Sequence, residues 1–269
     1  MNGDTPVLFG ADGPDMGGFS NILAVIGASM WKVGQMKSGD TVQFVLVNAN
    51  DAKTIDQAQE QWVSSSLSST SSTPPNVKAH SNISQEFISS ATIHREGNIR
   101  IAWAGDEFMI FELGQMTLDL SIRLQVEMWE REVKKKNVPG IDYFNTCIRS
   151  SVLRFDPKII DAAKVAQIML ETAKSLPSVR DIELPITIHK MPVVVDDPWT
   201  KEATEYYMRT ARKDAIYLPN NGKYVARNNG RPPSAVADAI NGTPWLVVAT
   251  GFFLALPFVI VSPFLVETV

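Results

Sequence analysis

The longest regular pattern of apolar and polar positions begins at residue 99. Residues 99–113 (I-R-I-A-W-A-G-D-E-F-M-I-F-E-L) alternate on both sides of a turn signal at 104–106, which predicts a β-hairpin. In residues 117–136 the apolar side chains then recur at helical spacing. One face of the predicted helix holds Leu118, Ile122, Val126, Trp129 and Val133.

The next part of the chain continues this alternation of strands and helices. Residues 142–156 predict two short strands or one bent strand, and 186–195 (I-T-I-H-K-M-P-V-V-V) is again typical of a strand. Between them a second helix is expected over 156–175, with Asp156 as its N-cap and Pro157 at its first position. From the second hairpin strand onward the order is β-α-β-β-α-β. This is the ferredoxin-like pattern, an antiparallel sheet with two helices on one face, so the fold class is α+β.

The flanking regions are less regular. Residues 42–46 alternate as a strand does, and 51–63 favour a short helix. Residues 64–76 (S-S-S-L-S-S-T-S-S-T-P-P-N) are too polar to order a backbone and predict a linker. Downstream, a third helix is expected after Asp197 and Pro198, followed by short helical stretches near 221–228 and 233–241.

The C-terminal region permits two structures on hydropathy alone. No charged residue occurs between Asp238 and Glu267, and the apolar run inside this gap exceeds the ~20 residues that span a bilayer. The alternative is two buried strands joined through Gly251 and Pro257.

Composition narrows the class of partner and compartment. The 269 residues carry a formal net charge of −4, which argues against nucleic acid as a main partner. The basic run at 134–136 suits the end of the first helix and its dipole. Cys147 is the single cysteine, so no internal disulfide can form, and the first residues lack the basic and apolar regions of a signal peptide. We expect a cytoplasmic protein.

Short motifs add little chemistry of their own. D-G-P-D-M-G-G-F at 12–19 is neither a Walker loop nor G-x-G-x-x-G, which favours a structural turn. The three histidines show no ligand spacing, so no metal site is expected. Cys147 is best explained as a small core residue. Asp196 and Asp197 could form an acid–base pair, but helix capping by Asp197 explains them more simply.

Two long stretches resemble known domains. Residues 13–44, from G-P-D-M-G-G-F to S-G-D-T-V-Q-F, resemble the closing segment of the allophanate hydrolase subunit 2 type domain, with Met16 in place of a threonine and Ser29 in place of an aspartate. From A-G-D-E-F-M-I-F-E-L-G at 104 to A-T-G-F-F-L-A-L-P-F, which ends at 258, the chain resembles the subunit 1 type domain. I-R-S-S-V-L-R-F-D-P is another mark of that domain. Together they resemble the carboxyltransferase region of the urea carboxylase and urea amidolyase family.

The resemblance implies a domain plan. Residues 1–52 would be the tail of carboxyltransferase subdomain A/B, a partial β-rich domain, and 53–91 the Ser/Pro-rich linker. Residues 92–195 would be the ferredoxin-like part of subdomain C/D, and 196–269 a helical segment with the start of a truncated cyclophilin-like β-barrel. The chain would then be a fragment that is inactive alone, with the family pattern ending near Phe258. Because soluble relatives carry a similar G-F-F stretch, the resemblance implies β-structure or loop at 244–258, not a membrane span.

The resemblance also implies chemistry and partners. In the complete family enzyme this region transfers a carboxyl group from carboxybiotin to urea or a related small amide, giving allophanate. Biotin would be carried by a biotinyl domain, and ATP would be used in a biotin carboxylase domain, both outside this chain. Such transfer needs hydrogen-bond donors near developing charge and a group that takes a proton.

The candidates for these roles are few, and each has a structural alternative. They are Arg149, Asn220 and Asn221, with the backbone of Gly17 and Gly18 for substrate binding. Arg149 could instead pair with a carboxylate across the sheet, and the two asparagines could cap a helix or form a turn. A second function class stays open: a non-catalytic binding or regulatory module, such as the related kinase-inhibitor and 5-oxoprolinase subunit families suggest.

Overall fold

The structure is a computed structural model that describes residues 7–10, 23–66, 89, 91–181, 183–253 and 256–261. Gly17, Gly18 and most of the predicted linker lie outside the described residues. The chain divides into two compact units. One comprises Met1–Leu184 with Val248–Phe258, and the other comprises Pro185–Val247 with Val259–Val269.

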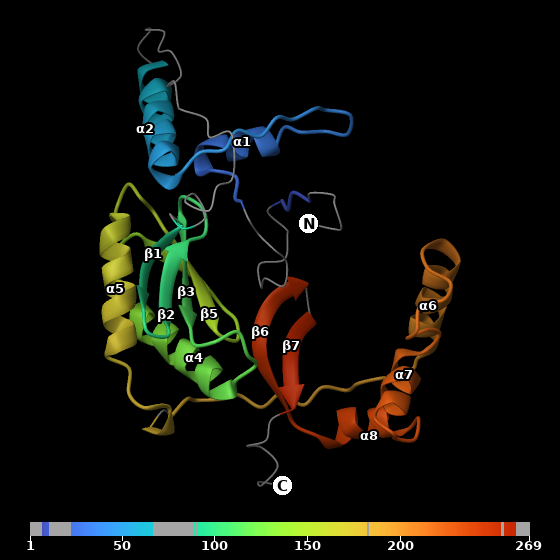
Figure 1. Cartoon of the computed structure of the whole chain (residues 1–269). Helices are drawn as coiled ribbons and strands as arrows, with labels where there is room; N and C mark the ends of the chain where they lie inside the picture. The colour runs from blue at the N-terminus through green and yellow to red at the C-terminus, as the bar shows by residue number, and fades with distance from the viewer. Residues whose placement is uncertain are drawn as a thin grey trace. The chain divides into compact units, whose positions relative to one another are not determined.

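The first unit is built on a five-stranded antiparallel sheet (Figure 1). Its strand order is β1-β2-β3-β5-β4. The predicted hairpin is confirmed as β2 and β3, with Ala102 opposite Ile110, and residues 142–156 form two strands, not one bent strand. The strands are β1 (Thr92–Glu96), β2 (Ile99–Trp103), β3 (Phe108–Leu113), β4 (Ile141–Thr146) and β5 (Ser150–Phe155).

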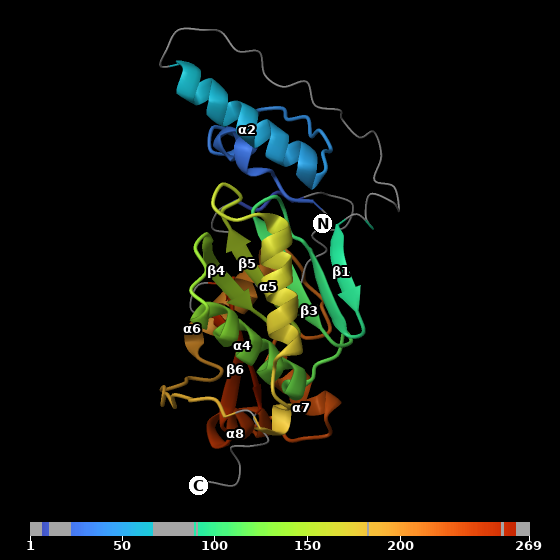
Figure 2. The ribbon, with the colours of Figure 1, turned by 90° about the vertical axis from the view of Figure 1, so that its left-hand side faces the viewer.

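Two helices, α4 (Leu120–Lys135) and α5 (Ala162–Lys174), cover one face of this sheet (Figure 2). The Trp129 ring on α4 stacks on Phe111 of β3, with centroids 4.1 Å apart and planes 5° apart. Its Nε1 donates a hydrogen bond to the Met169 carbonyl of α5 at 3.0 Å, so this buried polar atom is satisfied. The predicted helix face is confirmed at Val126, Trp129 and Val133, which are buried, whereas Leu118 precedes the helix and is exposed.

The start of α5 differs from the prediction. Its N-cap is Asp161, whose carboxylate accepts from the Ala163 amide at 2.8 Å. The expected cap, Asp156, accepts from the Lys158 amide at 2.8 Å and closes a turn that precedes the helix. A proline suits the second position of such a turn as well as the first turn of a helix, so Pro157 does not distinguish the two.

The predicted last strand of the β-α-β-β-α-β unit is also wrong. After α5 and the short 3₁₀ turn η2 (Val179–Asp181), residues 183–195 belong to no strand or helix. The sheet position beside β3 is occupied by β2, so it is not available to a later strand. Pro185 and Pro192 also lack the amide hydrogen that a ladder requires.

The described N-terminal part is helical. It contains the 3₁₀ turn η1 (Gly27–Ser29), the short α1 (Met30–Val33) and α2 (Ala49–Ser66), which confirms the helix expected at 51–63. The strand expected at 42–46 is wrong, because only Leu46 makes a β-bridge there. The described residues before β1 therefore show no strand of the expected β-rich domain. Apolar side chains such as Phe44 stay exposed, because no partner strand lies among the described residues.

The second unit contains the three helices predicted downstream. Asp197 caps the first of them, accepting from the amides of Trp199 at 2.9 Å and Thr200 at 3.0 Å, as expected. The second and third helices contact each other. The helices are α6 (Pro198–Thr210), α7 (Asn221–Asn228) and α8 (Ala235–Gly242).

The apolar C-terminal region forms strands. β6 (Trp245–Phe253) and β7 (Leu256–Val261) pair as a two-stranded sheet, which agrees, for the described residues, with the expectation of β-structure or loop at 244–258. Val248 and Ala249 are buried. None of the helices in the described ranges is both long and apolar enough to traverse a bilayer.

Candidate functional site

Arg149 lies in the turn between β4 and β5, where it contacts the end of β3. Its Nη2 is 2.6 Å from Glu112 Oε1, and its Nη1 donates to the Gly114 carbonyl at 3.2 Å. The backbone joins the same two segments, because the Leu113 amide donates to the Arg149 carbonyl at 2.8 Å. The proposed alternative for Arg149, a carboxylate partner across the sheet, is therefore confirmed.

Glu112 also binds a second arginine. Arg100 of β2 lies opposite Glu112 in the antiparallel register, and its Nη1 pairs with Glu112 Oε2. Arg100 Nε donates to Thr92 Oγ1 on β1 at 3.1 Å. Arg100, Glu112 and Arg149, here named the arginine–glutamate cluster, have side chains that are 28%, 15% and 20% exposed. Charge-assisted bonds of this kind are short and roughly twice as strong as neutral ones.

The arginine–glutamate cluster joins two stretches that carried the family resemblance. Glu112 and Gly114 belong to G-D-E-F-M-I-F-E-L-G, and Arg149 belongs to I-R-S-S. Sequence reasoning missed Arg100 and did not name Glu112 as the partner. A signal was present, since each is a charged residue inside an otherwise apolar strand, which requires a partner when half-buried.

Asn220 and Asn221 lie in the second unit, at the start of α7. The Asn220 carbonyl oxygen Oδ1 accepts from the Lys223 amide at 2.8 Å, so Asn220 is the helix N-cap. Its Nδ2 donates to Asp196 Oδ1 at 2.8 Å. Asn221 is the first residue of the helix. The capping alternative is thus confirmed for Asn220.

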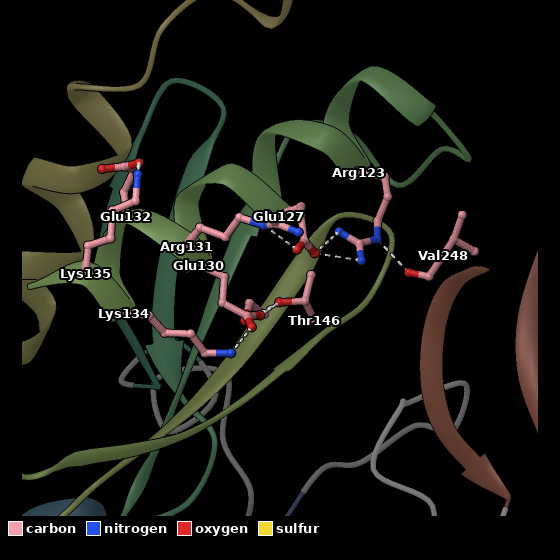
Figure 3. A network of polar contacts seen from close by, with 10 residues as sticks. Arg123, Glu127, Glu130, Arg131, Glu132, Lys134, Lys135, Thr146 and Val248 are labelled. Atoms are coloured by element: carbon pink, nitrogen blue, oxygen red, sulfur yellow. Dashed lines mark hydrogen bonds and ion pairs between the residues drawn. The ribbon is translucent and has the colours of Figure 1, made fainter. Parts of the chain in front are cut away.

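A network of charged side chains runs along α4 (Figure 3). Glu127 accepts from Arg123 at 3.0 Å and from Arg131 at 2.8 Å. Arg123 Nε also donates to the Val248 carbonyl at 2.6 Å, which attaches β6 to α4. Partial burial raises the pKa of Glu127, but the hydrogen bonds and charges of Arg131 and Arg123 lower it by more, so the net pKa lies below its ordinary value.

A second carboxylate of α4 faces the sheet. Glu130 Oε2 accepts from Thr146 Oγ1, and the Ser151 hydroxyl lies 3.4 Å from the same oxygen. Lys134 Nζ lies 2.5 Å from Glu130 Oε1 (Figure 3). These contacts fix the helix on the sheet. In the described residues no group of three His, Cys, Asp or Glu side chains could hold a metal ion.

The sequence matches a carboxyltransferase family over most of its length. The family described as carboxyltransferase domain, subdomain C and D, matches residues 99–263. The chain belongs to this family. The family described as carboxyltransferase domain, subdomain A and B, matches residues 1–46. The match to the first family continues to 263, so the expected end of the family pattern near Phe258 was too early.

Similarities to individual proteins and solved structures are consistent with this family. Urea amidolyase of Saccharomyces cerevisiae is 26% identical over 96% of this chain and 14% of its own length, and a putative urea carboxylase of Emericella nidulans is 25% identical over 95% and 22%. The crystal structure of the K. lactis urea amidolyase has a TM-score of 0.67 at 21% identity, covering 87% of this chain and 14% of that one. The Kluyveromyces lactis urea carboxylase structure gives a TM-score of 0.66 at 20% identity, covering 88% of this chain and 21% of that one. The chain thus spans about a seventh to a fifth of the length of these relatives, and the structural likeness shows the fold.

Proposed function

We propose that this chain is the carboxyltransferase region of a biotin-dependent urea carboxylase, which transfers a carboxyl group from carboxybiotin to urea and gives allophanate. The observation that carries the proposal is the family match over residues 99–263, together with relatives named for urea. We also propose that β6 and β7 begin the cyclophilin-like barrel of this family.

We propose a role for each candidate site residue in this function. Arg149 would donate hydrogen bonds to oxygen atoms that gain negative charge, and Glu112 and the Gly114 carbonyl would hold its guanidinium in one orientation. Asn220 and Asn221, at the start of α7, are retained as candidate catalytic residues. Gly17 and Gly18, which lie outside the described residues, are retained as candidates for substrate binding. Arg149 lies in one unit and Asn220 in the other.

No described residue is assigned to biotin here. Arg149 donates from Nη1 to the Gly114 carbonyl and from Nη2 to Glu112, and Asn220 donates from Nδ2 to Asp196, so each of these donors has a partner within its own unit. Carboxybiotin would bring the carboxyl group that is transferred. We assign no step of that transfer to a biotin contact in this chain, and we expect biotin and the biotin carboxylase to come from other domains.

The test uses a hybrid enzyme. The matched region of the Saccharomyces cerevisiae urea amidolyase is replaced by this chain, and urea-dependent incorporation of labelled bicarbonate is measured. We expect activity, and we expect Arg149→Ala to reduce kcat by about 10²-fold, as removal of a preorganised donor does. A folded hybrid without urea-dependent incorporation would contradict the proposal. An active hybrid that Arg149→Ala leaves unchanged would instead remove Arg149 from the site.

The chain by itself should not carboxylate urea. Positioning errors of about 1 Å can cost ~10²-fold in rate, and the family builds its pocket from more than one domain. Purified chain is incubated with labelled carboxybiotin and urea, and labelled allophanate is measured. Turnover above the buffer rate that Arg149→Ala abolishes would contradict this expectation.

A non-catalytic binding module is the second candidate. It is favoured by the intramolecular bonds of Arg149 and Asn220, which give both side chains a structural purpose. In that case the hybrid enzyme would fold and stay inactive, while the chain would still bind a partner domain.

A further inference from the structure

A cavity of about 260 Å³ lies in the first unit, between α2 and one end of the sheet, where β2 and β5 end and β3 begins. Its walls come from the first half of α2, from β1, from the β2–β3 turn and from the start of α5. Ion pairs hold α2 at this position: Lys53 is 3.5 Å from Asp161 at the start of α5, and Lys158 pairs with Glu60. The volume is just below the ~300 Å³ at which pockets for drug-sized ligands begin, so the cavity suits a single side chain or a molecule of that size.

Two aromatic rings contribute to the wall on the sheet side. Trp103 ends β2 and Phe155 ends β5, with ring centroids 6.1 Å apart and planes inclined by 42°. Aromatic faces carry negative charge density and attract cations that come within about 6 Å. Rings of this kind also cover the aliphatic stem of a long side chain.

The charged groups of the wall are mainly acidic. Four carboxylates line the cavity: Asp56, Asp106, Glu107 and Asp161. Lys53 offsets Asp161, and Arg154 pairs with Glu107 at 3.4 Å from outside the lining. The N-termini of α2 and α5 add about half a positive charge each. Asp56 and Asp106 therefore leave the cavity negative.

Asp56 differs from the other three carboxylates. Asp106 accepts from the Gly27 amide at 2.9 Å, and Glu107 and Asp161 have the partners named above. Asp56 has no hydrogen-bond partner among the described residues, although Lys158 lies close enough to act on its charge. Burial raises the pKa of Asp56 above its ordinary value, against the opposite effect of Lys158. A cation inside the cavity would add to the partial compensation that Lys158 provides.

Other ligand classes fit less well. A metal ion needs several converging ligands, and the part of the chain that the structure describes contains no group of three suitable side chains. A phosphate or carboxylate would meet the negative charge of Asp56 and Asp106. A neutral apolar group would desolvate Asp56 further and add no counter-charge.

We propose that this cavity binds an ammonium or guanidinium group on a short aliphatic stem, as a lysine or arginine side chain or a small diamine presents it. The carboxylate of Asp56 pairs with the charge, and Trp103, which rests on the buried Phe155, covers the stem. This site is independent of urea and of the arginine–glutamate cluster.

The binding experiment uses the whole chain and two-dimensional NMR. The Trp103 indole signal is assigned from Trp103→Phe and is followed during titration with N-acetyl-lysine methylamide, N-acetyl-arginine methylamide and 1,4-diaminobutane. N-acetyl-norleucine methylamide is the neutral control. We expect saturable shifts with at least one cationic probe and none with norleucine. Binding of the capped amino acids would indicate a polypeptide partner, and binding of the diamine alone would indicate a free metabolite.

Charge variants test the assignment to Asp56. Asp56→Asn keeps the size of the side chain and should weaken binding about tenfold, which corresponds to about 1.4 kcal/mol. Glu132→Gln, which changes a partly exposed carboxylate on α4 outside the cavity lining, should leave the affinity unchanged. Equal binding of norleucine, no saturable shift with any probe, or an unchanged affinity in Asp56→Asn would overturn the proposal. None of these readouts depends on carboxyltransferase activity.

Discussion

Strand β3 and the segment 186–195 have similar alternations of apolar side chains but different structures. In β3, Met109 and Phe111 are fully buried, and both edges of the strand are paired, by β2 and by β5. In the second segment Ile188 is 72% exposed and Val194 is 76% exposed, and no ladder is present. The alternation therefore shows which residues could share a face of a sheet. Whether a strand forms depends on a neighbour with free backbone groups and on a helix layer that buries that face.

The largest difference between the two regions should appear in core truncations. Trp129→Ala removes the ring that stacks on Phe111 and the bond to the Met169 carbonyl, so it should cost about 3–5 kcal/mol of unfolding free energy. Trp199→Ala, at a side chain that is 77% exposed, should stay within about 0.5 kcal/mol. Urea denaturation measures both. If Trp129→Ala is too unstable to purify, Val126→Ala tests the same core at a smaller cost, and similar values for the exposed and buried sites would contradict the layer described here.

A smaller difference is expected for charged residues. Glu112→Gln leaves the guanidinium groups of Arg100 and Arg149 without their shared anion. Because the side chains are partly exposed, the cost should be about 1–3 kcal/mol, below the 3–5 kcal/mol of a fully buried pair. The matched change in segment 186–195, Lys190→Gln, should cost less than about 0.5 kcal/mol of unfolding free energy. A double-mutant cycle with Arg149→Gln should show coupling between the two sites, and purely additive costs would refute the ion pair.

A still smaller effect should depend on pH. The folded pKa of Glu127 lies below its ordinary value of 4.5, so its stabilising contribution is complete above that value and is lost as the pH falls through the folded pKa. The contribution should be about 1 kcal/mol or less, because these side chains are only partly buried. Glu127→Gln should flatten the acid side of a plot of unfolding free energy against pH. Superimposable acid limbs for the two proteins would show that the arginines on α4 do not interact with Glu127.

The smallest effect on unfolding free energy is expected in segment 186–195, which belongs to no strand. Ile188→Thr replaces a side chain that is 72% exposed, so unfolding free energy should change by less than about 0.5 kcal/mol. The matched substitution Ile101→Thr on β2 places a hydroxyl in the core and should cost several times more. Thermal and urea unfolding would show both. A large loss from Ile188→Thr would mean that this segment packs against something in solution, and the contrast with β3 would no longer hold.

Elements whose signals lie close together in the sequence were predicted correctly. Predictions were wrong where the structure of a segment depends on a partner that is distant in the sequence. The hairpin of β2 and β3, the face of α4 and the Asp197 cap rest on residues within a few positions of one another, and they are correct apart from Leu118, which precedes α4. The strands expected at 42–46 and 186–195 needed a neighbour, which no local pattern reveals. The N-cap of α5 was misplaced because Asp156 and Asp161 each precede helix-favouring residues.

For the candidate site, too, the sequence indicated the local features but not the partners that the fold brings together. Arg149 was chosen for its chemistry, and sequence reasoning allowed for a carboxylate partner but could not identify it. Glu112 becomes that partner only because β3 and β5 are neighbours in the sheet, although α4 and β4 separate them along the chain. The cavity at Asp56 was not foreseen at all, because it depends on how α2 lies against the β2–β3 turn.

The strand order of the sheet also has a consequence for the time course of folding. β1, β2 and β3 follow one another as a meander, and β4 and β5 form a second hairpin, so both parts can form within microseconds from local contacts. Only the ladder between β3 and β5, with Ile110 opposite Val152, joins residues on opposite sides of α4 and β4. Contacts across such long separations slow folding, so this ladder is the step expected to limit the rate. Substitutions at Ile110 and Val152 should then slow refolding, whereas those on β1 should mainly accelerate unfolding.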